Sequence, residues 1–529
     1  MEQAAAAQAE GDEKPLQIGQ FGVGFYSAFM VAEQVDFIAR KAGAEEAWVW
    51  SSDGRGEFTL RPATADDGLP NGARGARIVL HLKEDAEEYL EPSRVEHVVK
   101  THSDHIGLPV FLREGAGERR QINESAALWT KSKSDVTERQ YAEFFRHIGG
   151  GFGDPWETAH IRAEGVIEYS ALLFVPKERP FDLFDPDRKN RLRLYVKRVF
   201  ITDDCQPLIP PYLRFLRGVV DTEDLPLNVS REMLQGSPLL AKIRDGLARR
   251  VLEALKKRAE ANAEDYQTFW EAFGSVLKEG LYEPDAQKDR IPPLLRFRSS
   301  MREGWVSLAD YVAAMKEGQE AIYTLSGSDD PETLKRSPHL EGFAAKGVEV
   351  LLLTDPVDEF WPQAVGAFDG KSFKSVTRGA VDLDAVDAAD ADEAKEEASE
   401  DSAGVPGLVA ALRAALGEGV KDVRESRRLT QSPVVLVADE GDLDINLERI
   451  LRQHQRLDSA SKRILEINPN HAMIRALDAR LTAEGAALGI EEYALLLLDQ
   501  ARILEGEAPP DPAAFSRRFA DALARGLAA

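Results

Sequence analysis

Hydrophobic residues recur in several distinct patterns along the 529-residue chain. Four short runs rich in β-branched and aromatic residues lie between residues 35 and 83, separated by Gly, Asp and Pro, and they predict an antiparallel sheet. The following segment predicts a helix with Ser93 as its N-cap, ended by Gly107 and Pro109, and then one more strand. Together these elements predict a helix-on-sheet domain that ends near Leu112.

A longer α/β pattern follows residues 113–127, a charged segment that we interpret as a linker. Across residues 128–378, strand-like runs such as GVIEYSALLFVP alternate with helical ones, including LLAKIRDGLARRVLEALKKRAEA. This alternation predicts a larger α/β domain with a helical insert, and EAIYTLSG and GVEVLLLTDPVDEF predict a second α/β unit at its end. Residues 379–404, rich in Ala, Asp and Glu, are interpreted as a flexible acidic linker.

The remaining residues, 405–529, have a mostly helical pattern and predict a small terminal domain. In its last helix Phe515, Phe519, Leu523 and Leu527 recur every four residues, which places them on one face. Such a stripe can be buried inside the domain or against a second copy of the chain. Periodicity alone leaves both alternatives open.

Charge and composition narrow the possible partners. The chain has 66 Lys and Arg residues against 91 Asp and Glu residues, a net charge of -25, which argues against nucleic acid or an anionic membrane as the main partner. No run approaches the roughly 18 apolar residues of a membrane-spanning helix, and the opening residues do not have the pattern of a secretory signal. We therefore expect a cytoplasmic location. The single cysteine, Cys205, cannot form a disulfide within the chain and is interpreted as a small apolar residue.

The stretch GQFGVGFYSAFMVA, residues 19–32, has three glycines whose spacing matches neither a dinucleotide-binding fold nor a P-loop. Gly22 and Gly24 allow close approach of a ligand to the backbone, and the residues from Phe25 onward predict a buried helix. The free N–H groups at the start of such a helix suit an anion. The alternative, favoured by spacing alone, is a tight turn before a core helix.

The complete string IGQFGVGFYSAFMVA closely resembles the last glycine box of the ATP pocket in the heat-shock protein 90 family, bacterial HtpG type. Further strings, among them NESAALWTKSKSDVTERQYAEFF, LPLNVSREMLQ and EINPNHAMIRAL, resemble family segments in family order from Ile18 onward. The resemblance implies an α+β multidomain fold. It implies a GHKL-type ATPase domain at 18–112, truncated at its front, a client-binding middle domain at 128–378 and a dimerisation domain at 405–529.

The resemblance also implies site residues. The loop that wraps the ATP phosphates corresponds to Gly22, Val23, Gly24 and Phe25, with Gln20 at its approach. In the middle domain, the residue that reaches the γ-phosphate corresponds to Arg231, supported by Asn228 and Gln235 of the same loop. Phe515, Phe519, Leu523 and Leu527 are assigned to the dimer interface.

Arg231 also stands out without the resemblance. Ser230 is a natural N-cap and places Arg231 in a first helical turn, where the helix dipole disfavours a cation unless an anion is near. A γ-phosphate would be such an anion. The alternative is a local ion pair with Glu232 or a nearby aspartate.

The family's ATP pocket further requires a catalytic glutamate, a magnesium-binding asparagine and a D-x-G-x-G aspartate box, all upstream of the glycine segment. Residues 1–17 resemble none of these and are interpreted as a leader outside the family pattern. Ala76 stands where the family usually has a threonine that contacts the adenine end. ATP and Mg²⁺ are thus expected cofactors of an incomplete site, and this chain alone is expected to be inactive as an ATPase. A truncated sequence is favoured over a natively short start.

Two functions follow from the resemblance. The first is an ATP-dependent chaperone of the HtpG type, a homodimer that assists the folding of client proteins. The second is a nucleotide-independent dimeric holdase or scaffold. Other GHKL enzymes are disfavoured by the acidic charge and by LPLNVSREMLQ. No metal site formed by side chains of the chain is predicted.

Overall fold

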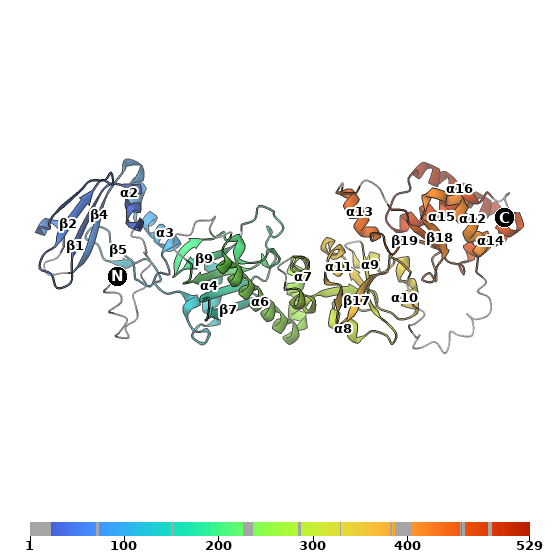
Figure 1. The fold of residues 1–529 in the computed structure, drawn as a ribbon, viewed down its shortest axis with the longest axis horizontal. Helices are drawn as coiled ribbons and strands as arrows, with labels where there is room; N and C mark the ends of the chain where they lie inside the picture. Colours follow the sequence, from blue (N-terminus) through green and yellow to red (C-terminus); the bar gives the residue numbers. More distant parts are fainter. Residues whose placement is uncertain are drawn as a thin grey trace. The chain divides into compact units, whose positions relative to one another are not determined.

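The structure is a computed structural model with side chains, and it divides the chain into two compact units. The first unit comprises Met1–Pro210 and Arg214–Arg250, and the second comprises Pro211–Leu213 and Val251–Ala529. Each unit combines helices with β-sheets (Figure 1), which confirms the mixed α+β class. The described residues are 23–69, 74–149, 153–189, 191–225, 236–283, 287–327, 330–380, 383, 386, 404–454, 456–457, 461–484 and 489–528.

The first unit begins with the predicted four-stranded antiparallel sheet, in the order β3-β2-β1-β4. Short hydrophobic runs separated by turn residues form these strands, as the alternation predicts. A short 3-10 helix, η2, and a four-residue helix, α2, precede the sheet. The bounds are η2 Val23–Ser27, α2 Ala28–Val31, β1 Ala32–Arg40, β2 Trp48–Ser52, β3 Phe58–Pro62 and β4 Gly75–Leu82.

The predicted helix after this sheet is present as α3, Pro92–His102. Its N-cap is Glu91, so the prediction of Ser93 as the cap is wrong. The reason is Pro92, whose fixed φ and missing N–H suit the first helical position and move the start forward. The predicted extra strand is β5, Phe111–Leu112, which pairs with β6, Arg120–Gln121.

A five-stranded sheet follows in the same unit, in the order β10-β9-β11-β8-β7. Helix α4 starts at a capping box, in which Thr137 accepts a hydrogen bond from the Gln140 N–H. The core between α4 and the sheet contains Trp129, whose Nε1–H donates to Asp221 Oδ2 at 2.9 Å. The bounds are α4 Glu138–His147, β7 Glu157–Ala163, β8 Tyr169–Val175, β9 Leu192–Val196, β10 Val199–Thr202 and β11 Arg217–Thr222.

Helix α6, Pro238–Ala261, contains the point at which the two units divide. In the second unit α7 follows, and then a six-stranded sheet in the order β13-β12-β15-β14-β17-β16. Lys278 of α7 is buried and lies 2.8 Å from carboxylate oxygens of Asp355 and Asp358. The bounds are α7 Ala263–Glu279, β12 Arg296–Ser299, β13 Val306–Ser307, α8 Leu308–Ala313, β14 Ala321–Ser326, α9 Pro331–Leu334, α10 Glu341–Ala345, β15 Leu351–Leu353, α11 Trp361–Val365, β16 Ala367–Phe368 and β17 Lys371–Ser375.

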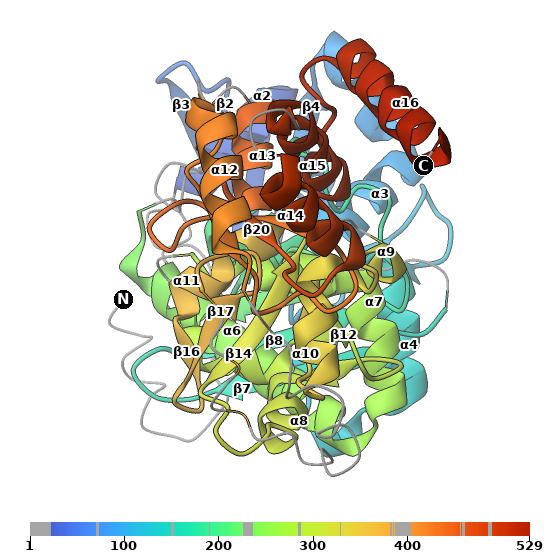
Figure 2. The same ribbon diagram turned by 90° about the vertical axis from the view of Figure 1, so that its right-hand side faces the viewer.

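The C-terminal part of the second unit is mostly helical, as predicted, around a three-stranded sheet in the order β18-β20-β19. Apolar residues of α12, α14 and α15 form one core with this sheet, and Figure 2 shows these helices beside one another. No helix within the described part of the chain is long and apolar enough to cross a membrane. The bounds are α12 Pro406–Leu416, β18 Asp422–Glu425, β19 Val434–Val437, α13 Ile445–Gln453, β20 Ile464–Ile467, α14 Ala472–Glu484, α15 Ile490–Leu504 and α16 Pro512–Ala528.

Cys205 is buried, which agrees with its interpretation as a small apolar residue. Burial raises the pKa of its thiol to about 11, so the thiol is protonated at neutral pH. This protonation makes Cys205 a poor nucleophile.

Gly218, in β11, allows a test of the close strand packing in the five-stranded sheet. Its φ is +145°, and a Cβ at this position would lie 2.1 Å from the carbonyl oxygen of Leu172. We expect Gly218→Ala to lower the free energy of unfolding by about 2–5 kcal/mol, because it adds both backbone strain and overpacking.

The matched control is Gly407→Ala, because Gly407 lies in helix α12 and an added Cβ meets nothing within 4 Å. This control is expected to be neutral or stabilising by up to about 1 kcal/mol. Urea unfolding followed by circular dichroism measures both variants, and equal effects would contradict the tight contact at Gly218.

Candidate functional site

The predicted phosphate-binding loop lies only partly within the described residues. Gln20 and Gly22 lie outside them, whereas Gly24 and Phe25 belong to η2. A Cβ added at Gly24 would meet no atom of the described residues within 4 Å, so these residues leave the backbone there open. The carbonyl oxygen of Gly24 accepts a hydrogen bond from Ser27 Oγ at 2.7 Å, which closes the turn. The roles of these residues toward ATP stay predictions.

The expected buried helix after the glycines is wrong in both length and burial. Helix α2 has four residues and none of them is buried, because the chain enters β1 directly at Ala32. Tyr26 is 66% exposed. Phe25 instead anchors the turn to the sheet, with its ring edge-on to Phe37 at 5.9 Å and to Trp50 at 5.7 Å.

The sheet that Phe25 contacts has one exposed apolar side, which we call the aromatic face. Strand register places Phe37 opposite both Trp50 and Ile78, and Trp50 opposite Leu60, so all of these share that side. Contiguous apolar surface of this kind marks a binding or docking region. The members of the aromatic face that are at least 40% exposed are Trp48, Phe58, Leu60, Ile78 and Leu80.

The predicted γ-phosphate arginine, Arg231, and its supporting residues Asn228 and Gln235 lie outside the described residues, as does Ser230. Ala76 is described and pairs with Ala39 in the first sheet. The geometry therefore does not test the predicted catalytic loop.

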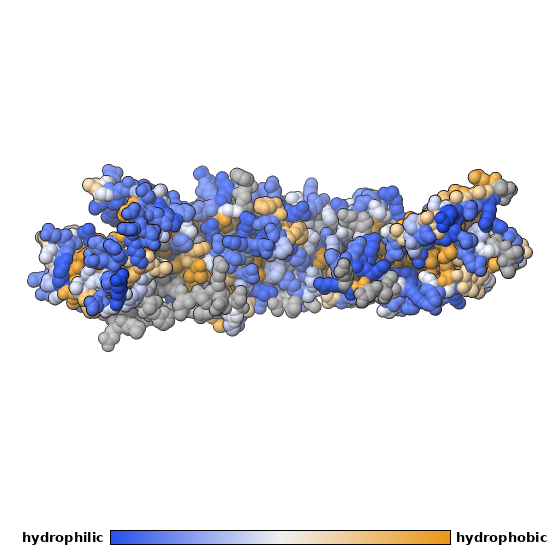
Figure 3. Space-filling model, turned by 90° about the horizontal axis from the view of Figure 1, so that it is seen from above, coloured by the Kyte–Doolittle hydropathy of each residue, from blue (hydrophilic) through white to orange (hydrophobic). Residues whose placement is uncertain are grey.

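The C-terminal stripe is exposed on the single chain. Phe515 and Phe519 stack with their ring centroids 6.0 Å apart, and Phe519, Leu523 and Leu527 are between 52% and 88% exposed. An ion pair from Arg518 to a buried carboxylate of α15 at 2.7 Å holds the other side of α16. Figure 3 shows hydrophobic surface at this end of the chain. Phe519, Leu523 and Leu527 are therefore not buried by the described residues of this chain, and their place in a dimer interface stays a prediction.

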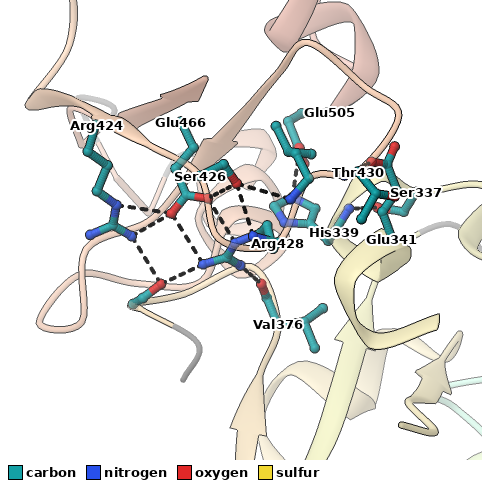
Figure 4. A network of polar contacts seen from close by, with 12 residues as sticks. Ser337, His339, Glu341, Val376, Arg424, Ser426, Arg428, Thr430, Glu466 and Glu505 are labelled. Carbon is teal, nitrogen blue, oxygen red and sulfur yellow. Dashed lines mark hydrogen bonds and ion pairs between the residues drawn. The ribbon is translucent and has the colours of Figure 1, made fainter. Parts of the chain in front are cut away.

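A buried polar network connects the segment after β17 to the C-terminal sheet (Figure 4). Arg428 is 3% exposed and lies 3.0 Å from Glu466 Oε2. It also donates hydrogen bonds to the carbonyl oxygens of Val376 and Gly379. Arg424 completes the network by donating to Glu466 Oε1 at 2.7 Å. Both charges of the central pair are thus hydrogen-bonded, which a buried ion pair requires.

Glu341, at the start of α10, makes a second connection within the same unit. Its carboxylate accepts hydrogen bonds from the backbone N–H groups of Thr430 and Gln431 at 2.7 Å and of Ser432 at 3.1 Å. Burial would raise the pKa of Glu341, but these hydrogen bonds outweigh burial and lower it. Nearby, the buried His339 contacts Glu505 at 2.8 Å through Nε2.

A cavity of about 210 Å³ lies next to these contacts and is lined by residues that include Ser326, His339 and Asn446. Asn446 donates a hydrogen bond to Glu359, a buried carboxyl. Burial raises the pKa of Glu359 to about 7, with a further contribution from the charge of Asp444. This carboxyl therefore titrates near neutrality.

One group of side chains within the described residues has the spacing of metal ligands. Single ligand atoms of Asp104, His105 and Glu124 all lie within 4.8 Å of one another. However, His105 Nδ1 contacts the Ala126 carbonyl oxygen, and Asp104 Oδ1 accepts the Glu124 N–H. Part of the ligand capacity of this group is therefore used by hydrogen bonds that join neighbouring segments of the chain.

Comparison with known proteins now adds to this geometry. The family described as "Hsp90 protein" matches residues 112–529, more than half of the chain. The chain therefore belongs to the Hsp90 family. Within that family its relatives are of the bacterial HtpG type.

Three relatives are each named "Chaperone protein HtpG". The protein of Paramagnetospirillum magneticum is 54% identical over 98% of this chain, and that of Rhodospirillum rubrum is 50% identical over 99%. The protein of Roseobacter denitrificans is 52% identical over 96%. The matches cover 83%, 82% and 80% of these relatives, so the chain spans about four fifths of their length.

The buried network around Arg428 gives the first test of this region. We expect Arg428→Ala to lower the free energy of unfolding of the second unit by about 3–5 kcal/mol, because Glu466 stays buried without its main partner. The control is Arg424→Ala, since the Arg424 side chain is 31% exposed and its loss should cost about 1 kcal/mol or less. Urea unfolding of both variants measures the difference, and losses of the same size would contradict a central role for Arg428.

The ionisation of Glu359 predicts how the stability of the folded chain depends on pH. The pKa of Glu359 in the folded chain, about 7, lies above the ordinary glutamate value of 4.5, so the carboxyl ionises at lower pH in the unfolded chain. Stability contributed by protonated Glu359 is therefore present below about pH 4.5 and is lost as the pH rises to about 7, a loss of about 2–4 kcal/mol.

We expect Glu359→Gln to remove this part of the pH dependence and to be more stable than the parent at pH 8. Urea midpoints at pH 5.5 and pH 8 for parent and variant measure the effect. A variant whose midpoint changes with pH as much as the parent's would show that Glu359 is not the titrating group.

Proposed function

We propose that this chain is a molecular chaperone of the HtpG type, which binds non-native client proteins and assists their folding. The observation that carries this proposal is 54% identity to an HtpG chaperone over 98% of the chain. The match includes both units, so it concerns the protein as a whole and not one shared domain. A cytoplasmic location belongs to the same proposal.

Nucleotide use is a finer part of the proposal. Residues 18–112 are proposed to form part of a GHKL-type ATPase domain, in which the loop containing Gly24 lies against the phosphates of ATP with Mg²⁺. The open backbone at Gly24 supports this placement. Arg231 is proposed to stabilise the γ-phosphate, together with Asn228 and Gln235. ATP hydrolysis would need, besides these residues, the catalytic glutamate, the magnesium-binding asparagine and the aspartate box named above.

A nucleotide-independent holdase is the second candidate, and the aromatic face favours it. Exposed aromatic and aliphatic side chains on one sheet offer a surface for apolar segments of unfolded proteins. This function needs neither a glutamate to orient water nor an aspartate to recognise adenine. The two candidates differ in their response to ATP.

The proposed function is tested by light scattering of a heat-unfolded test enzyme with and without the purified chain. We expect the chain to suppress aggregation at less than one dimer per client, whereas an equal mass of an inert protein does not. Addition of ATP and Mg²⁺ separates the two candidates. A change in suppression together with binding in calorimetry supports the nucleotide-dependent chaperone, and no change without binding supports the holdase. Aggregation that proceeds unchanged would contradict chaperone function.

The aromatic face is examined in the same assay through a double variant. Phe58→Ser with Leu60→Ser is expected to weaken suppression, and Thr59→Ser, on the opposite side of the same strand, serves as the control. Equal activity of the two variants would exclude the aromatic face as a client surface.

We propose that the exposed stripe of α16 pairs with the same stripe of a second chain to form a homodimer. Replacing Phe519 and Leu523 with Glu is expected to give monomers at micromolar concentration, because each copy would place charge in an apolar contact. Arg517→Glu, also on the exposed surface of α16, is the matched control and should stay dimeric. Sedimentation equilibrium measures the mass, and a dimeric double variant would place the interface elsewhere.

A further inference from the structure

A group of arginines lies at one edge of the five-stranded sheet, outside every site described above. Arg191 directly precedes β9, and Arg217 is the first residue of β11. The two strands are parallel neighbours, with Leu192 opposite Gly218, so both arginines stand at the same strand ends. Arg188 comes from the loop that leads into β9. We call these three residues the arginine cluster.

A single carboxylate, that of Asp182, is paired with the arginine cluster among the described residues. Its Oδ2 lies 2.6 Å from Arg191 Nη2, and its Oδ1 lies 3.7 Å from Arg188 Nη1. Among the residues that the structure describes, Asp182 is also the one acidic group that acts on the pKa values of Arg188 and Arg217. Within this described part of the chain, three guanidinium charges therefore share one negative charge.

Two of these guanidinium groups are buried. The Arg188 side chain is 4% exposed and Arg217 is 3% exposed. Among the described residues, Nε, Nη1 and Nη2 of Arg188 have no hydrogen-bond partner, nor do Nε and Nη1 of Arg217. Buried guanidinium groups are normally paired and hydrogen-bonded, because desolvation of an unpaired charge costs several kcal/mol.

The pKa values of two arginines in the cluster are also lowered, which agrees with a shortage of negative charge around them. Burial lowers the pKa of Arg217 to about 9, and repulsion from Arg191 and Arg188 adds to it. Burial also lowers the pKa of Arg188, with Asp182 opposing and the neighbouring arginines adding. Water could satisfy the N–H groups, but it cannot balance the excess positive charge. An anion would do both.

We propose that Arg188 and Arg217, with Arg191 at the rim, form a binding site for a small inorganic oxyanion of the phosphate class. The planar fork of N–H donors on an arginine matches the oxygens of phosphate. Because the donors are shielded from solvent, we expect the site to bind a free ion in preference to a phosphate attached to a larger group. The site contains none of the residues assigned to ATP, and it does not depend on the proposed chaperone function.

The test uses the full chain and inorganic phosphate. Thermal unfolding is followed as phosphate replaces chloride at constant ionic strength. We expect the Tm to rise by several degrees and to saturate at millimolar phosphate, because an ion that binds the folded chain stabilises it. Equilibrium dialysis with labelled phosphate is expected to give one ion per chain.

Arg188→Gln is expected to abolish both the saturable rise in Tm and the bound ion. Arg179→Gln is the matched control, since Arg179 is an exposed arginine of the same loop region and should keep both. A rise in Tm that is the same in parent and Arg188→Gln would be a general salt effect and would overturn the proposal.

Two further measurements distinguish an enclosed anion site from a purely structural ion pair and from an open site. Asp182→Asn removes the one negative charge, so its affinity for phosphate should increase at least several-fold while its Tm without phosphate falls. A purely structural ion pair would lower the Tm without any change in phosphate binding. Glycerol phosphate is expected to give no saturable rise, and a response equal to that of inorganic phosphate would contradict the enclosed site.

Discussion

The second unit depends on one buried ion pair, Arg428 with Glu466. Glu466 lies in β20, between apolar neighbours, so its charge has to be balanced inside the protein. Arg428 balances this charge and also donates hydrogen bonds to backbone carbonyl oxygens after β17 (Figure 4). The same ion pair therefore joins the α/β part of the second unit to its C-terminal part. Separating the two parts would leave an unpaired buried carboxylate, which makes the separated state unfavourable. The two parts are therefore expected to behave as one body.

The sheet at the beginning of the first unit, in contrast, leaves apolar side chains exposed. Its aromatic face carries exposed side chains that a folded domain normally buries, next to a glycine loop whose backbone is open. A surface of this kind gains free energy by contacting other apolar groups, whether these belong to a client protein or to further parts of a longer chain. The same property gives this sheet a tendency to aggregate.

The sequence predicted those parts of the molecule that depend on local patterns. Short β-branched runs predicted β1 to β4, and the four-residue repeat from Phe515 predicted one apolar face of α16 without showing whether that face is exposed. The cap at Ser93 was wrong because Pro92 takes the first helical position, and the expected helix after Phe25 was wrong because β1 begins at Ala32. The pairing of Arg428 with Glu466 could not be predicted, since it joins residues 38 positions apart. A lone glutamate in the apolar run ILEI was the available signal.

The contact between Glu341 and the loop at 430–432 has a consequence for measurement. Three consecutive amide protons bond to one carboxylate there, and these amides can exchange with solvent deuterium only when that carboxylate moves away. Their exchange rates therefore report the fraction of time for which the contact is open. Hydrogen exchange of a peptide that spans this loop would therefore measure how often the contact within the second unit opens, without any label attached to the protein.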